Sequence, residues 1–286
     1  MVTSGVLATI LLFVEFSEST LRHISSKILS NLTFYSGVGE GDETSLSSGV
    51  LPIISLIILS AHRIDTLCYC IINLNNLANV FDSTDSTVAV RMLLNLATRL
   101  EVLTNVNNAI FLTDVLKNVS RINRYMIPLC EESALPLLLN VADEHFNQQI
   151  IINMAECFMN LSMSKKNRRD IAISGVAFHL ERIFSVGTPD ARAHILRMIG
   201  NLLHSGFFHE RIAKDEILKT ILENMMDPLQ VRQFSAVCYC FSQLCFQDLS
   251  IKVRNICGYL IFSFILFILF YYFAVLQCSM VRWLLY

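Results

Sequence analysis

The hydrophobic and polar positions of this chain repeat with a nearly constant period. Six times, an Asn or Gln stands near the end of an apolar stretch, with a large apolar residue two positions before it and an aliphatic residue one position after it. These polar residues, called the ladder amides below, are Asn31, Asn76, Asn118, Asn160, Asn201 and Gln243. Successive members lie 45, 42, 42, 41 and 42 residues apart. Such a register predicts an internal structural repeat.

A second apolar stretch precedes each ladder amide. Its apolar residues recur at helical spacing, and several copies begin with Gly or with a residue that commonly caps a helix. The six stretches are Gly5–Val14, Gly49–Ile58, Thr87–Ala97, Ser133–Ala142, Gly175–Phe184 and Asp215–Met225. Polar segments such as Ser36–Ser48 and Ser162–Asp170 separate the units, and we expect turns there. Each unit is therefore predicted to hold at least two helices.

Two helices of this length bury too little apolar surface to fold alone, whereas stacked pairs share a continuous core. The sequence therefore predicts an all-α protein, a right-handed α-solenoid of about six repeats over residues 1–250. Its 10 glycines and 5 prolines are few for the many tight turns of a β-sandwich or barrel.

The endings of the repeat carry a resemblance to a known family. The phrases SNLT (Ser30–Thr33), NNLA (Asn75–Ala78) and MNLS (Met159–Ser162) resemble the third helix of armadillo repeats, and GVLP at Gly49 resembles their second helix. The resemblance covers roughly residues 5–248. HEAT repeats are the close alternative, because Asp227–Leu244 is almost as similar to a HEAT second helix.

The armadillo resemblance implies a function for the ladder amides. In that family the third helices line a concave groove, and the Asn near the helix end often holds the backbone of an extended peptide. An Asn side chain suits this task because it both donates and accepts hydrogen bonds. The residues alone leave an alternative open, in which the amides bridge neighbouring helices of the stack.

One departure from the family bears on the partner. Importin-α-like armadillo proteins place Trp four residues before this Asn. The equivalent residues here are Lys27, Ile72, Asp114, Glu156, Arg197 and Tyr239, and the single Trp of the chain is Trp283. We therefore do not expect a nuclear-import receptor for basic signals.

The C-terminal part, residues 251–286, has a different pattern. Residues 256–276 contain no charged side chain and, as a helix, are long enough to cross the hydrocarbon core of a bilayer. This segment predicts a C-terminal transmembrane helix that anchors a cytoplasmic solenoid to an intracellular membrane. A non-native tail and a buried terminal helix are the alternatives. No polar capping unit precedes Gly5–Val14, so this stretch is either an unusual apolar cap or, as we expect, part of a fragment of a longer protein.

Composition and motifs limit the classes of function that this chain could have. The formal net charge of −2 gives no global field for nucleic acid. The nine cysteines lie mostly in apolar stretches, which favours a reduced, cytoplasmic protein. Cys68 with Cys70, and Cys238 with Cys240, have a spacing that suits core packing better than a metal site. No nucleotide, hydrolase or metal motif occurs, so we expect no cofactor and no enzymatic activity.

Two further patterns have structural interpretations. The Asn-x-Ser/Thr triplets that begin at Asn31, Asn118 and Asn160 match the glycosylation sequon, but they coincide with the repeat ending and are attributed to its packing. The basic run Lys165–Arg169 is interpreted as a solvated loop between units.

These observations favour a non-enzymatic scaffold or adaptor that binds an extended or helical segment of another protein in its groove. A soluble cytoskeletal, ciliary or regulatory armadillo adaptor with a non-native tail is the first alternative. A transport receptor of the HEAT or karyopherin type is the second.

Overall fold

The computed structural model of the chain describes residues 4–16, 19–36, 43–61, 63–77, 83–176 and 187–206, with the short pieces 179–180, 183–184, 236 and 239–240. Every regular element in these ranges is an α-helix. The helices are α1 (Ser4–Phe16), α2 (Ser19–Ser36), α3 (Glu43–Ser60), α4 (Ile64–Asn76), α5 (Ser83–Arg99), α6 (Val106–Ser120), α7 (Asn123–Glu131), α8 (Ala134–Glu144), α9 (Gln148–Met163), α10 (Arg168–Ile173) and α12 (Pro189–His204). The all-α prediction is confirmed for this part of the chain.

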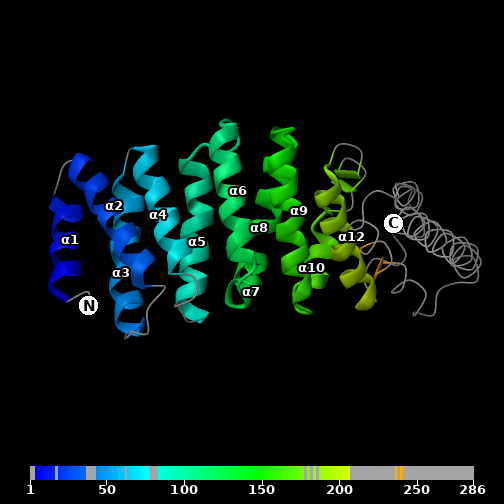
Figure 1. Cartoon of the computed structure of the whole chain (residues 1–286), viewed down its shortest axis with the longest axis horizontal. Coiled ribbons are helices and arrows are strands. Elements are labelled where there is room, and N and C mark those ends of the chain that lie inside the picture. The colour runs from blue at the N-terminus through cyan, green and yellow to red at the C-terminus, as the bar shows by residue number, and fades with distance from the viewer. Residues whose placement is uncertain are drawn as a thin grey trace, which may run out of the picture.

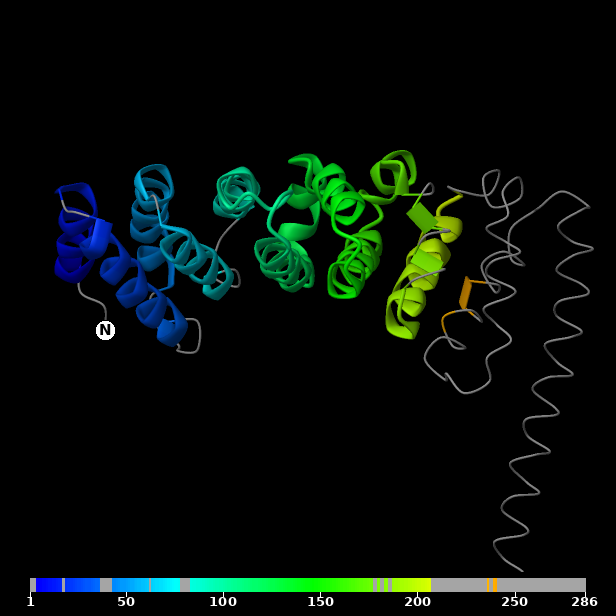
Figure 2. The same cartoon turned by 90° about the horizontal axis from the view of Figure 1, so that it is seen from above.

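The described helices stand side by side in chain order along the longest axis, from α1 to α12 (Figure 1). The view from above shows the same order (Figure 2). The helices that carry the ladder amides form one row, in which α2 packs against α4, α4 against α6, α6 against α9, and α9 against α12. In a second row, α1 packs against α3, and α3 packs against α5. The described part is thus an elongated stack of helical units, each in contact with its neighbours.

The core runs along this stack and follows the register of the sequence. The residues two positions before the ladder amides are almost completely buried wherever they are described: Leu29, Leu74, Leu116, Phe158 and Ile199. They belong to one continuous cluster of buried apolar side chains. Burial of this apolar face supplies most of the stability of such helices, because isolated helices of this length are marginal in water.

Local sequence sets where several helices begin. The side chains of Asn105 and Asn147 accept hydrogen bonds from two backbone N–H groups in the first turns of α6 and α9, respectively. The Thr188 hydroxyl accepts one hydrogen bond, from the backbone N–H group of Ala191, at the start of α12. Pro189 occupies the first position of that helix. These caps satisfy N–H groups that have no partner within the helix.

One local prediction was wrong. The segment Ser36–Ser48 was expected to be a turn, but α3 begins at Glu43 within it. A carboxylate is favoured near a helix N-terminus, where the helix dipole is positive. The short helix α7 was not predicted separately, and it makes the fourth unit a set of three helices, α7, α8 and α9.

Several predictions fall outside the described residues. These are the stretch Asp215–Met225, the ladder residue Gln243 and the segment 256–276 with its proposed membrane anchor. Among the helices that are described, none is long and apolar enough to cross a membrane. The C-terminal anchor stays a prediction.

Candidate functional site

The five described ladder amides lie at equivalent places on consecutive helices. Asn31 is on α2, Asn76 on α4, Asn118 on α6, Asn160 on α9 and Asn201 on α12. Their exposure differs: Asn31 is exposed, Asn160 is buried, and the other three are half-buried. Burial of Asn160 leaves its amide no access to an external peptide.

Three ladder amides join their own helix to the preceding ladder helix. In each case the side-chain Nδ2 group donates to a hydroxyl that stands two positions after the previous ladder amide. The pairs are Asn76 with Thr33 (3.2 Å), Asn160 with Ser120 (2.9 Å) and Asn201 with Ser162 (2.9 Å). These bonds correspond to the bridging role that the sequence left open as an alternative.

The three hydroxyls are held in place by their own helices. Thr33, Ser120 and Ser162 each donate to the backbone carbonyl three residues earlier, at 3.0, 2.6 and 2.6 Å. The hydroxyl hydrogen is thus oriented within the helix, and the oxygen lone pairs face the next ladder amide. In the triplet that begins at Asn160, the amide and the Ser162 hydroxyl therefore bond to opposite neighbours. In the triplets that begin at Asn31 and Asn118, only the hydroxyl joins a neighbouring ladder helix.

Asn118 is the exception among these amides. Its Nδ2 group donates to Asp114 Oδ2 at 3.3 Å, in the same helix, and its Oδ1 atom accepts from Arg121 at 3.5 Å. The residue two positions after Asn76 is Ala78, which has no hydroxyl. The α4–α6 junction therefore lacks the acceptor that the other junctions use.

Two buried amides that the sequence analysis missed reinforce the junctions. Asn73 Oδ1 lies 2.9 Å from Thr33 Oγ1 and is the alternative to the Ser30 carbonyl as acceptor for the single hydroxyl hydrogen. Asn73 Nδ2 donates to the Ser26 carbonyl at 3.3 Å. Asn153 donates to Thr113 Oγ1 at 3.3 Å across the α6–α9 contact. Both side chains are completely buried. Their register could have revealed them, since they lie three and seven positions before a ladder amide, on the side that faces the preceding helix.

The row continues beyond α12. Tyr239, four positions before Gln243, donates its hydroxyl to Asn201 Oδ1 at 2.9 Å. Gly200 permits this approach, because a Cβ atom at that position would lie 2.6 Å from the Tyr239 ring. A glycine next to the ladder amide therefore serves close packing of the next unit.

Charged side chains from α6, α9 and α12 gather beside the ladder amides. We call this surface the polar face, and its members are Asp114, Lys117, Arg121, Glu156, His194 and Arg197. Arg121 Nε donates to Glu156 Oε1 at 3.1 Å, and Glu156 Oε2 lies 3.9 Å from His194 Nε2. Lys117 pairs with Asp114 at 2.5 Å and reaches Asn153 Oδ1 at 3.3 Å. The polar face thus spans three consecutive ladder helices, with ion pairs on α6 and α9 and His194 of α12 beside Glu156.

His194 has a perturbed titration within this network. Burial lowers its pKa, because removal from water disfavours the imidazolium ion. The neighbouring Glu156 carboxylate acts in the opposite direction, while the Arg197 charge adds to the lowering. The imidazole Nδ1 atom lies 3.3 Å from Met159 Sδ on α9.

The basic run Lys165–Arg169 was interpreted as a solvated loop, and this is wrong for Arg168. Lys165, Lys166 and Arg169 are exposed, whereas Arg168 is buried. The Arg168 guanidinium donates to the carbonyls of Ser162 and Met163 at the end of α9, and to the Ser205 hydroxyl at 2.6 Å. It satisfies helix-end carbonyls that would otherwise lack a partner.

The described cysteines are packing residues. Cys70, Cys130, Cys157 and Cys240 are buried, and Cys68 is half-buried. Burial raises the pKa of the Cys157 and Cys240 thiols to about 12, so both are protonated at neutral pH. Within the part of the chain that is described, no group of three or more His, Cys, Asp or Glu side chains could hold a metal ion.

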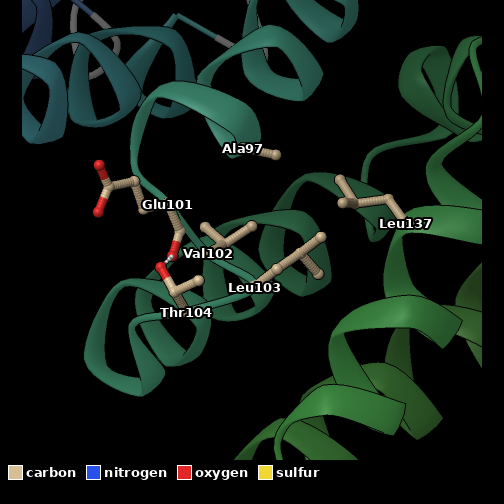
Figure 3. Close-up of a pocket in the computed structure, with 6 residues that line it drawn as sticks. All are labelled: Ala97, Glu101, Val102, Leu103, Thr104 and Leu137. Atoms are coloured by element: carbon tan, nitrogen blue, oxygen red, sulfur yellow. Dashed lines mark hydrogen bonds between the residues drawn. The ribbon is translucent and has the colours of Figure 1, made fainter.

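A hollow of about 390 Å³ lies between the end of α5, the following loop and α8. Figure 3 shows Leu103 and Leu137 at this space, with the Glu101 carboxylate directed away from them. The Thr104 hydroxyl donates to the Glu101 carbonyl at 3.1 Å. Ligand sites normally combine apolar walls with polar groups directed inward, and this hollow offers no such group.

Comparisons with known proteins concern the fold. No family model matches the chain, and no curated protein matches it. Crystal structures of engineered proteins from the Northeast Structural Genomics Consortium are similar to it. Two have a TM-score of 0.60 at 11% and 12% identity, with 83% of this chain and 97% of the other covered. A third has a TM-score of 0.64 at 11% identity and covers 84% of this chain and 58% of the other. At these identities the likeness shows a shared fold alone.

Proposed function

We propose that this chain is a right-handed α-solenoid of armadillo or HEAT type that acts as a non-enzymatic scaffold, binding a segment of a partner protein along its polar face. One observation carries the proposal: the ion pairs of Asp114 with Lys117 and of Arg121 with Glu156 lie on one surface, beside His194 and Arg197 of α12. In armadillo proteins, which the sequence resembles, the equivalent helices line the groove that holds the partner.

The exposure of the charged groups supports a binding surface. The side chains of Arg121 and Asp114 are 55% and 45% exposed, whereas their partners Glu156 and Lys117 are each 14% exposed. The less exposed partners fix the positions of the exposed groups, which reduces the entropy lost on binding. We expect a partner segment that carries both an acidic and a basic side chain, and binding that weakens as salt rises.

Among the ladder amides, we propose a binding role for Asn118. Its amide bonds within its own helix, to Asp114, and it adjoins Arg121 on the polar face. Asn76, Asn160 and Asn201 instead use their amide groups to join helices. In this proposal those three hold the stack together, so that the polar face keeps its shape.

Affinity enrichment from cell extract with quantitative mass spectrometry tests the proposal. The full chain is compared with Arg121→Ala and with a matched control, Arg91→Ala. Each variant breaks one Arg–Glu pair: Arg121 at the end of α6 with Glu156 of α9, and Arg91 of α5 with Glu132 at the end of α7 (2.7 Å). We expect Arg121→Ala to weaken binding of the enriched partner by about tenfold or more, equal to about 1.4 kcal/mol.

The control separates binding from stability. Arg91→Ala should retain the partner, and both variants should keep the helical circular dichroism of the parent. Equal retention by the two variants, confirmed with the purified partner, would show that the polar face is not the binding surface.

A further inference from the structure

The turn between α9 and α10 is held in place by two buried polar residues that bond to three helices. Asn167 Nδ2 donates to the Met126 carbonyl of α7 at 2.7 Å and to the Leu161 carbonyl of α9 at 3.2 Å. Arg168 donates to carbonyls at the end of α9 and to the Ser205 hydroxyl at the end of α12, as described above. Asn167 and Arg168 are only 2% and 7% exposed. The position of the turn is therefore fixed relative to α7, α9 and α12.

The other three basic residues of this turn are exposed to solvent. They are Lys165, Lys166 and Arg169, which together we call the basic turn. Within the described residues, none of the three belongs to an ion pair. Four basic residues stand between Met163 and Ile173, and Asp170 is the single acidic residue among them. Positive charge is therefore in excess at this place.

The positive charge continues on the neighbouring helix α7. Arg124 is exposed in the first turn of α7, two residues before Met126, whose carbonyl accepts the hydrogen bond from Asn167. Figure 1 shows α7 and α10 at the same edge of the stack. At the other end of α9, by contrast, the exposed residues Asp143 and Glu144 complete the preceding helix, α8. The two ends of α9 thus lie beside opposite charges.

Two exposed apolar side chains flank the basic turn. Met163, the last residue of α9, is 60% exposed, and Ile173, the last residue of α10, is 72% exposed. Ile173 follows Arg169 by four residues, so the two side chains share one face of α10. The basic turn therefore offers apolar contact beside its positive charges.

We propose that the basic turn binds an acidic segment of a partner protein, one in which Asp or Glu side chains stand beside an apolar residue. Carboxylates complement the three cations, and such complementarity sets the orientation and the rate of association. Because Asn167 and Arg168 already fix the turn, little backbone freedom is lost on binding. This surface uses none of the residues of the polar face and is a second binding site.

A short acidic segment suits the basic turn better than an extended polyanion does. The formal net charge of the chain is −2, so its long-range field does not attract a nucleic acid or an anionic membrane. A short segment responds instead to charges within the screening length, about 8–10 Å at physiological salt. Sites for single-stranded nucleic acid also supply aromatic side chains for stacking, and the sequence from Met163 to Ile173 contains none.

Fluorescence anisotropy of a labelled peptide, titrated with the full chain, tests the proposal. The probe is a short peptide of Glu residues with one central Leu, and its counterpart has Gln in place of every Glu. We expect the parent chain to bind the Glu peptide much more tightly than the Gln peptide, with an affinity that falls as salt rises. Lys165→Glu combined with Lys166→Glu should weaken binding at least about tenfold, because two attractions become repulsions.

The matched control reverses two exposed basic residues elsewhere, Lys27→Glu combined with Arg63→Glu. It changes the net charge by the same amount and should retain the Glu peptide. Both double variants should keep the helical circular dichroism of the parent. Equal losses in the two double variants would overturn the proposal, and so would equal affinities of the parent for the Glu and Gln peptides.

Two further measurements separate this site from other surfaces and ligands. Arg121→Ala, on the polar face, should leave binding of the Glu peptide unchanged, and a tenfold loss would place the peptide on the polar face instead. Vesicles of phosphatidylserine and of phosphatidylcholine test the membrane. A preference for phosphatidylserine that requires Lys165 and Lys166, without binding of the Glu peptide, would also overturn the proposal. All variants share the segment 256–276, so any effect of that segment is equal among them.

Discussion

The α6–α9 and α4–α6 junctions bring equivalent helix positions together with different chemistry. At α6–α9, the amides of Asn153 and Asn160 are buried and bond across the junction. At α4–α6, Asn118 is half-buried and bonds within its own helix. In the described residues, no side-chain hydrogen bond joins α6 to α4. The same repeat position can therefore either join two units or stay at the surface.

The two junctions also differ in sequence at the position of the acceptor. Ser120 provides an acceptor two positions after Asn118, whereas Ala78 at the same place after Asn76 provides none. A buried amide without a partner is costly, so Asn118 takes Asp114 instead. At each junction where the preceding ladder helix supplies this hydroxyl, the ladder amide bonds across to it.

The largest expected effect comes from removing the same side chain at the two junctions. Asn160→Ala deletes a buried donor and leaves a void, and should lower the free energy of unfolding by about 1–3 kcal/mol. Asn118→Ala removes a half-buried amide bonded only within α6 and should cost about 0.5 kcal/mol or less. Urea unfolding followed by circular dichroism measures both. Equal losses would show that the two junctions do not differ as proposed.

A smaller effect is expected from the hydroxyl alone. Ser162→Ala removes the acceptor of the Asn201 amide and should cost about 1 kcal/mol, because the donor remains half-buried without it. The matched control is Ser174→Ala, since Ser174 makes the same bond to the carbonyl three residues earlier, at the end of α10. If Ser174→Ala lowered the free energy of unfolding as much as Ser162→Ala, the loss would come from the bond within the helix and not from the bond to Asn201.

The smallest effect concerns pH and the α9–α12 junction. Burial lowers the pKa of His194 in the folded chain, so the unfolded chain binds a proton more readily. The stability from neutral His194 is therefore present above the unfolded pKa of about 6.5 and is lost as pH falls through the folded pKa. The free energy of unfolding of His194→Gln should decline less than that of the parent between pH 7 and 5. If the free energy of unfolding fell equally in the parent and the variant, His194 would not be a cause of the pH dependence.

The sequence predicted the helical class and its register because both depend on periodicity. Leu74, Leu116 and Phe158 stand at one place in the repeat, and each is buried in the structure. A side chain at such a position faces the core whichever neighbour supplies the contact, so pattern alone is sufficient.

The partners of the polar groups could not be predicted in the same way. The Arg121–Glu156 pair and the burial of Arg168 depend on which surfaces meet across units. Arg168 lies in a run of basic residues that has the composition of a solvated loop, yet its guanidinium closes the end of α9. Sequence identifies such groups but gives neither their direction nor their distance from a neighbouring helix.

By itself, the sequence determined that this chain is helical, where its repeat lies, and which positions are apolar, since these follow from the spacing of side chains around a helix. Only the tertiary structure decided that Asn160 joins two helices, that Asn118 bonds within its own helix, and that Leu21, Ile24 and Ile28 of α2 are exposed. The physical reason is that a hydrogen bond or a buried contact requires two groups at a defined distance. For groups about 40 residues apart, that distance is set by how the units stack.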